Sequence, residues 1–86
     1  MNRSISLHGA LRDANPSGVI TLDIPSECSV ADLRDALLAH LREHAPQVSE
    51  GIVRRSAFAT SETILHDHQP VPSDGELAVL PPVSGG

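Results

Sequence analysis

The sequence predicts a single α+β domain in which one long helix packs across a mixed β-sheet. The chain has 86 residues, 40% of them apolar, which is enough for one hydrophobic core and too few for two. Two segments of alternating apolar and polar residues precede one segment with helical periodicity, and short apolar runs follow it. Because Phe58 is the only Phe, Tyr or Trp, the core must be aliphatic.

The first half of the chain predicts a hairpin followed by the helix. Ile5 and Leu7 alternate with polar residues, and residues 19–24 alternate in the same way after a segment rich in turn formers, 12–18. Two strands so close in sequence favour antiparallel pairing. Ser29 followed by Asp32 is typical of a capping box. Apolar residues recur behind it at helical spacing, so we expect a helix from about Val30 to about His44.

The second half of the chain predicts two or three short strands. Ile52 and Val53 are expected to open a short strand, although two arginines follow them directly. Residues 57–60 and 63–66 have the residue types of strands, and residues 77–80 form a compact apolar run that predicts a last, buried strand. Residues 68–75 are rich in proline, aspartate and glycine and are expected to form loop and turn.

Charge and cysteine content narrow the class of protein. The net charge is −5, and the cationic side chains are six arginines with no lysine, so nucleic acid is a poor ligand and a basic partner surface is favoured. Cys28 is alone, which excludes an internal disulfide and a multi-cysteine metal cage. No signal-peptide pattern or membrane-length apolar run is present, so we expect a soluble, cytoplasmic protein without a membrane partner.

The end of the sequence carries the strongest functional indication. Pro81 and Pro82 favour an extended, solvated segment, and Gly85 and Gly86 place no Cβ beside the terminal carboxylate. Such a tail can enter a narrow channel in a partner. We therefore divide the chain into a domain over residues 1–80 and a flexible tail over residues 81–86, called the C-terminal arm. The alternative is a frayed, glycine-rich end without a function.

The arm, with the residue before it, reads Leu80-Pro81-Pro82-Val83-Ser84-Gly85-Gly86 and resembles the C-terminus of molybdopterin synthase small subunits. These are ubiquitin-like sulfur carriers with the β-grasp fold. Residues 7–13 resemble the first strand and turn of that family, and residues 74–80 its last turn and strand. The Gly-Gly end is common to ubiquitin-like carriers, whereas Pro-Pro-Val-x-Gly-Gly is more specific for the molybdopterin branch. Leu80 stands where the family often has an aromatic residue. The resemblance implies a mixed sheet of four to five strands with one main helix across it.

The resemblance also implies a mechanism. An ATP-dependent adenylating enzyme of the ubiquitin-activating type would convert the Gly86 carboxylate to an acyl adenylate, and a sulfur donor would convert the adenylate to a thiocarboxylate. The arm would then insert into the large subunit of molybdopterin synthase, in a heterotetramer, and give sulfur to a pterin precursor of the molybdenum cofactor. This chain would bind no cofactor and no metal and would not be catalytic alone, because the partner uses the ATP.

Roles for single residues follow from the same resemblance. Gly86 would carry the sulfur, Gly85 would keep the arm slim, and the rest of the arm would hold it extended: Pro81, Pro82, Val83 and Ser84. Three apolar residues near the base of the arm are candidates for a partner interface: Leu80, Val79 and Phe58. For Val79 and Phe58, a place in the core is an equal alternative, since both belong to predicted strands.

Other constellations are interpreted as structural. Residues 40–44 match the inverse zincin string H-x-x-E-H, but a chain this small lacks a third ligand and a cleft, so we expect a polar helix end. His66 and His68 are expected to lie on a solvated loop. Cys28 is interpreted as a structural residue, with a persulfide relay as the alternative. Arg54 and Arg55 are expected to be solvated, with steering of an acidic partner as the alternative.

Three alternative functions stay open. The chain could carry sulfur for thiamine, cysteine or tRNA thiolation instead of molybdopterin. A ubiquitin-like protein modifier would be joined to target lysines, and the absence of lysine here excludes self-linked chains through a lysine. A plain interaction module with an inert tail is the third alternative.

Overall fold

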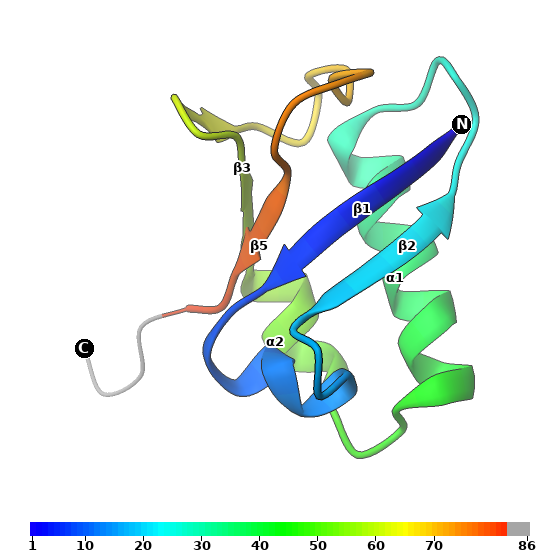
Figure 1. The fold of residues 1–86 in the computed structure, drawn as a ribbon, viewed down its shortest axis with the longest axis vertical. Helices are drawn as coiled ribbons and strands as arrows, with labels where there is room; N and C mark the ends of the chain where they lie inside the picture. The colour runs from blue at the N-terminus through cyan, green and yellow to red at the C-terminus, as the bar shows by residue number, and fades with distance from the viewer. Residues whose placement is uncertain (83–86) are drawn as a thin grey trace.

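The computed structural model describes residues 1–82, and its centre is a five-stranded mixed sheet (Figure 1). The strands are β1 (Asn2–Leu7), β2 (Val19–Asp23), β3 (Ala57–Ala59), β4 (Ile64–Leu65) and β5 (Ala78–Leu80). Their spatial order is β2-β1-β5-β3-β4. The last strand, β5, lies in the middle, parallel to β1 and antiparallel to β3. The predicted mixed sheet and the three short strands of the second half are confirmed, each strand shorter than its apolar run.

The predicted hairpin is confirmed, with a helical turn added to its connection. Strands β1 and β2 pair antiparallel from Asn2 opposite Asp23 to Ser6 opposite Val19. Between them lies a 3₁₀-helix, η1 (Gly9–Ala14), which begins before the turn-rich segment. Leu11 is fully buried and anchors η1 to the core.

Helix α1 (Val30–His44) has the predicted bounds and lies across one face of the sheet (Figure 1). The backbone N–H of Asp32 donates to Ser29 Oγ over 3.2 Å, and the Ser29 N–H donates to the Asp32 carboxylate over 3.2 Å. This reciprocal capping box satisfies two N–H groups that the helix itself leaves unpaired. The apolar stripe of α1 is buried: Val30, Leu33, Leu37, Leu38 and Leu41.

The predicted strand at Ile52 and Val53 is wrong, because residues 50–55 form a short helix, α2 (Glu50–Arg55). Helical geometry buries Val53 and half-buries Ile52 while the arginines that follow stay exposed. A six-residue helix is marginal by itself and depends on tertiary contacts. Those contacts come from α1, which is distant in sequence, so a local pattern could not reveal them.

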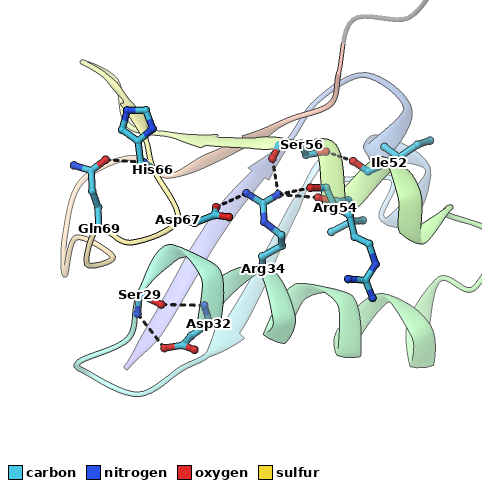
Figure 2. Close-up of polar contacts among 10 residues, drawn as sticks. Ser29, Asp32, Arg34, Ile52, Arg54, Ser56, His66, Asp67 and Gln69 are labelled. Carbon is cyan, nitrogen blue, oxygen red and sulfur yellow. Dashed lines mark hydrogen bonds and ion pairs between the residues drawn. The ribbon is translucent and has the colours of Figure 1, made fainter.

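The side chain of Arg34, on α1, provides these contacts (Figure 2). Its Nη1 donates to the carbonyl oxygens of Val53 over 2.9 Å, Arg54 over 3.3 Å and Ser56 over 2.5 Å. Its Nη2 forms an ion pair with Asp67 over 2.8 Å. The guanidinium also lies 5.1 Å from the centroid of the Phe58 ring, a cation–π distance. One largely buried side chain thus joins α1, the end of α2, the start of β3 and the loop after β4.

The hydrophobic core fills the space between the sheet and α1. Its fully buried large side chains come from β1, η1, both helices, β3, β5 and the residue before β5: Ile5, Leu11, Val30, Leu33, Leu37, Val53, Phe58, Leu77 and Val79. As the composition indicates, it is aliphatic apart from Phe58. No helix within residues 1–82 is long and apolar enough to cross a membrane.

We predict that Arg34→Lys lowers the free energy of unfolding by about 2 kcal/mol, because one ammonium group cannot reach three carbonyl groups and a carboxylate together. Urea unfolding followed by circular dichroism measures the change. The matched control is Arg54→Lys, an exposed arginine of the same connection, whose expected change is within about 0.5 kcal/mol. Equal midpoints for the two variants would contradict the role given to Arg34.

Candidate functional site

The candidate site is the base of the C-terminal arm, formed by Leu80, Pro81 and Gly9. Strand β5 ends at Leu80, which is paired with Ala57 of β3. On its other side, β5 is paired with β1, where Val79 lies opposite Leu7. Strands on both sides therefore fix the position and direction in which the chain leaves the sheet.

Gly9 allows the arm to pack closely against the loop after β1. A Cβ atom built on Gly9 would lie 2.7 Å from Pro81 Cγ, and the φ angle of Gly9 is +57°. Only glycine adopts this backbone conformation without strain, and only a residue without a Cβ leaves room for the proline ring. In the sequence, the one signal for Gly9 is its place directly after a predicted strand and before a turn.

Two of the three residues predicted as a partner interface do not lie on the surface. Val79 and Phe58 are both 0% exposed and are opposite each other in the β3–β5 ladder, on the face covered by α1. The alternative interpretation of these two residues as core is therefore the correct one. Leu80 is half-buried, because successive strand residues point to opposite faces of a sheet.

The face of the sheet opposite α1 continues from Leu80 as a shallow, open depression of small and polar residues. Ser4, Ser6, Ala59 and Ala78 line it, together with loop residues on either side. Two exposed apolar side chains lie near the outer edges of this face, Val19 at 41% and Ile64 at 56% exposed. The sequence reasoning missed this face, although the period-2 pattern of β1 and β5 indicates it.

Pro81 is half-buried against Gly9, and Pro82 is exposed. The remaining arm residues fall outside residues 1–82: Val83, Ser84, Gly85 and Gly86. Their roles, and the extended state expected of the arm, stay predictions.

Cys28 is a core residue rather than an activated thiol. Its side chain is 4% exposed. Burial is the main cause that raises the pKa of the thiol above its usual value, and the nearby Asp32 carboxylate raises it further, against a smaller lowering by the N-terminal amine. A raised pKa keeps the group as the unreactive thiol at neutral pH. The structure thus supports the structural interpretation over the persulfide relay.

Four of the five histidines form two pairs. The rings of His40 and His44 are 4.4 Å apart at their centroids, and those of His66 and His68 are 6.0 Å apart. Burial, and then the neighbouring His44, lower the pKa of His40, while Glu43 acts in the opposite direction. Within residues 1–82, no group of three or more His, Cys, Asp or Glu side chains is placed to hold a metal ion.

Comparison with solved structures identifies the fold. The crystal structure of SAMP1 from Haloferax volcanii has a TM-score of 0.72 at 22% sequence identity and covers 100% of this chain and 100% of that chain. A crystal structure of H. volcanii small archaeal modifier protein 1 has a TM-score of 0.71 at 19% identity and covers 95% of this chain and 98% of that one.

The ubiquitin-like (UBL) domain of Plasmodium falciparum Dsk2 has a TM-score of 0.63 at 17% identity, and it covers 95% of this chain and 97% of that chain. No protein-family model and no curated protein matches the sequence. These structural similarities confirm the ubiquitin-like β-grasp fold that the resemblance of the arm and its neighbouring segments implies.

We predict that Gly9→Ala displaces Pro81, because the new methyl group would occupy the position of the proline ring. The matched control is Gly75→Ala, where φ is +84° but a Cβ meets no atom within 4 Å. Both variants should lose about 1 kcal/mol through backbone strain. Only Gly9→Ala should also shift the amide resonance of Leu80, the residue before Pro81. Equal shifts of this resonance in the two variants would contradict the packing role of Gly9.

We predict that iodoacetamide alkylates Cys28 more slowly in the folded protein than in the urea-unfolded chain, because burial excludes the reagent and its raised pKa disfavours the thiolate. Mass spectrometry of timed samples measures the alkylation rate. Equal rates for the folded and unfolded chains would show an accessible, activated thiol instead.

The raised pKa of Cys28 also makes stability depend on pH. The contribution of the neutral thiol to stability is fully present below the pKa of Cys28 in the unfolded chain, and it is lost as the pH rises through the pKa of Cys28 in the folded protein.

Proposed function

We propose that this chain is a ubiquitin-like sulfur carrier whose Gly86 carboxylate is activated by a partner enzyme and converted to a thiocarboxylate. The observation that carries the proposal is the geometry at the base of the arm. A strand held on both sides ends at Leu80, and Pro81 packs against Gly9. In the sequence, Val83-Ser84-Gly85-Gly86 follows directly. A fixed base and a glycine end are what a partner with a narrow active-site channel requires.

Activation is needed because an oxygen of a carboxylate is a poor leaving group. In the proposed first step, a Gly86 carboxylate oxygen attacks the α-phosphate of ATP on the adenylating enzyme, and pyrophosphate leaves. In the second step, a hydrosulfide equivalent from a sulfur donor attacks the carbonyl carbon, and AMP leaves with the oxygen. The product is a thiocarboxylate, in which sulfur is a better nucleophile than carboxylate oxygen. This chain contributes the substrate carboxylate, and the partners contribute the catalysis.

The more specific proposal is that the chain is the small subunit of molybdopterin synthase. The Pro-Pro-Val-Ser-Gly-Gly end supports this assignment. Its partners would be the large synthase subunit, in a heterotetramer, and the adenylating enzyme, both in the cytoplasm. Carriers for thiamine, cysteine or tRNA thiolation would use the same chemistry on a different acceptor. The large subunit or acceptor enzyme that copurifies with the chain distinguishes these pathways.

A second candidate function is that of a protein modifier, in which an amine of a target protein attacks the activated Gly86 carbonyl carbon and forms an amide bond. The structural similarity to small archaeal modifier protein 1 favours it. Because the chain contains no lysine, conjugates could not extend through lysines of the modifier itself. A ladder of conjugates on immunoblots of cell extract, lost on deletion of Gly86, would favour the modifier over the carrier.

We predict that coexpression with the adenylating enzyme and a sulfur source yields chain whose intact mass corresponds to one oxygen replaced by sulfur. Deletion of Gly86 should abolish this change, because the chain then ends at Gly85 and its carboxylate lies one residue short of the reacting atoms. Cys28→Ala is the matched control and should be loaded normally, since Cys28 is buried in the core. Unmodified mass in the presence of a demonstrably active enzyme would reject the carrier function.

A further inference from the structure

The six arginines divide into two groups by their contacts. Arg3 is 8% exposed and donates through Nη2 to the Gly75 carbonyl oxygen over 3.0 Å. Arg34 forms the network described above, and Arg42 forms an ion pair with Glu50. These three side chains are occupied by contacts that hold the fold together.

The other three, Arg12, Arg54 and Arg55, are called the arm-end arginines here. All three are exposed, and none forms an ion pair with an acidic side chain of residues 1–82. Arg55 Nε donates to the Gly51 carbonyl oxygen over 3.1 Å, a contact within α2. Arg12 lies on η1, which begins at the glycine that contacts Pro81. The other two end α2, directly before β3, whose Ala57 is paired with Leu80. Figure 1 shows η1 and α2 at the end of the sheet where β5 ends and the C-terminal arm begins.

Most acidic residues lie toward the opposite end of the molecule. Strands β1 and β5 end near the base of the arm, whereas β2 and β3 run in the opposite direction and end at the far end of the sheet. The segments before β5, after β2 and after β3 therefore lie at this far end (Figure 1). These segments and the first turn of α1 carry Asp23, Glu27, Asp32, Glu62, Asp74 and Glu76. At the arm end, Asp13 on η1 and Glu50 on α2 are also acidic, and Glu50 is paired with Arg42. The arm end therefore carries charges of both signs, whereas the far end carries mainly acidic residues.

We propose that the arm-end arginines are a docking surface for an acidic rim on the partner protein that receives the arm; this rests on the proposed function. A guanidinium group binds carboxylates through two parallel hydrogen bonds, so arginine suits a protein rim of Asp and Glu. The uneven charge also orients the approach, because an acidic rim attracts the arm end and repels the far end. Electrostatic steering of this kind raises association rates by roughly 10- to 1,000-fold.

An acidic protein surface fits these observations better than a nucleic acid does. Nucleic acids carry charge along their whole length and would meet the acidic remainder of the chain. Single strands also need aromatic side chains for base stacking, and Phe58, the only Phe, Tyr or Trp, is fully buried.

The first experiment needs no natural partner. Amide resonances of the chain are followed at low salt during titration with a deca-glutamate peptide, and separately with an oligothymidylate. We expect the peptide to shift the amide resonances of residues 9–12, 54–55 and Leu80, and the triple variant Arg12→Gln/Arg54→Gln/Arg55→Gln to lose these shifts. The matched control is Ser26→Asp/Ser61→Asp/Ser73→Asp, which changes the net charge equally through exposed residues outside these elements. Shifts that are absent, scattered, or stronger with the oligonucleotide would overturn the proposal.

The second experiment measures adenylation by pyrophosphate exchange with the adenylating enzyme. The arginine triple variant should lower kcat/KM about tenfold through KM, with kcat retained and a weaker dependence on salt. The serine-to-aspartate control should stay close to the wild type. Equal kinetics for the arginine variant and the wild type would overturn the proposal. If the enzyme does not activate the wild-type chain, the proposed function fails, and the peptide titration still decides whether this surface binds carboxylates.

Discussion

The parallel pairing of β5 with β1 is the constraint on which the functional geometry depends. It places the last strand in the middle of the sheet, where β3 holds its other side. The end of β5 therefore has a fixed position relative to the core, and the residues after Leu80 begin from that position. Gly9 lies two residues after the end of β1, so the same pairing brings it to Pro81. A partner that binds the domain thus meets the base of the arm in one orientation.

The rest of the fold supports this arrangement from the other side. β3 holds β5 only if the chain enters β3 in the correct register, and Arg34 fixes that entry through the carbonyl group of Ser56. The same guanidinium covers the ring of Phe58, which packs opposite Val79 in the ladder. A side chain on α1 is thereby connected to the strand that carries the arm. The loss of its contacts would affect the exit of the arm as well as stability.

The sequence was sufficient for elements whose signals are local and strong. The capping box predicted the start of α1, Pro46 behind its apolar stripe predicted the end, and alternation predicted β1, β2 and their pairing. α2 was missed because its stability comes from Arg34, nineteen positions before Val53. Residue type alone leaves Val79 and Phe58 open between a partner interface and the core, because it does not tell which face of a strand is covered. The Gly9–Pro81 contact and the grouping of the exposed arm-end arginines arise from segments far apart in the chain.

The fate of the Gly86 acyl group tests the central claim most directly. The chain is incubated with the adenylating enzyme and isotopically labelled sulfur, and it is then purified. It is next incubated with the large subunit of molybdopterin synthase and a pterin precursor. The account predicts that the label leaves the chain and appears in the small-molecule product, with the chain recovered in its carboxylate form. Label that never joins the chain, or sulfide that is released as the chain becomes bound to a protein amine, would contradict it.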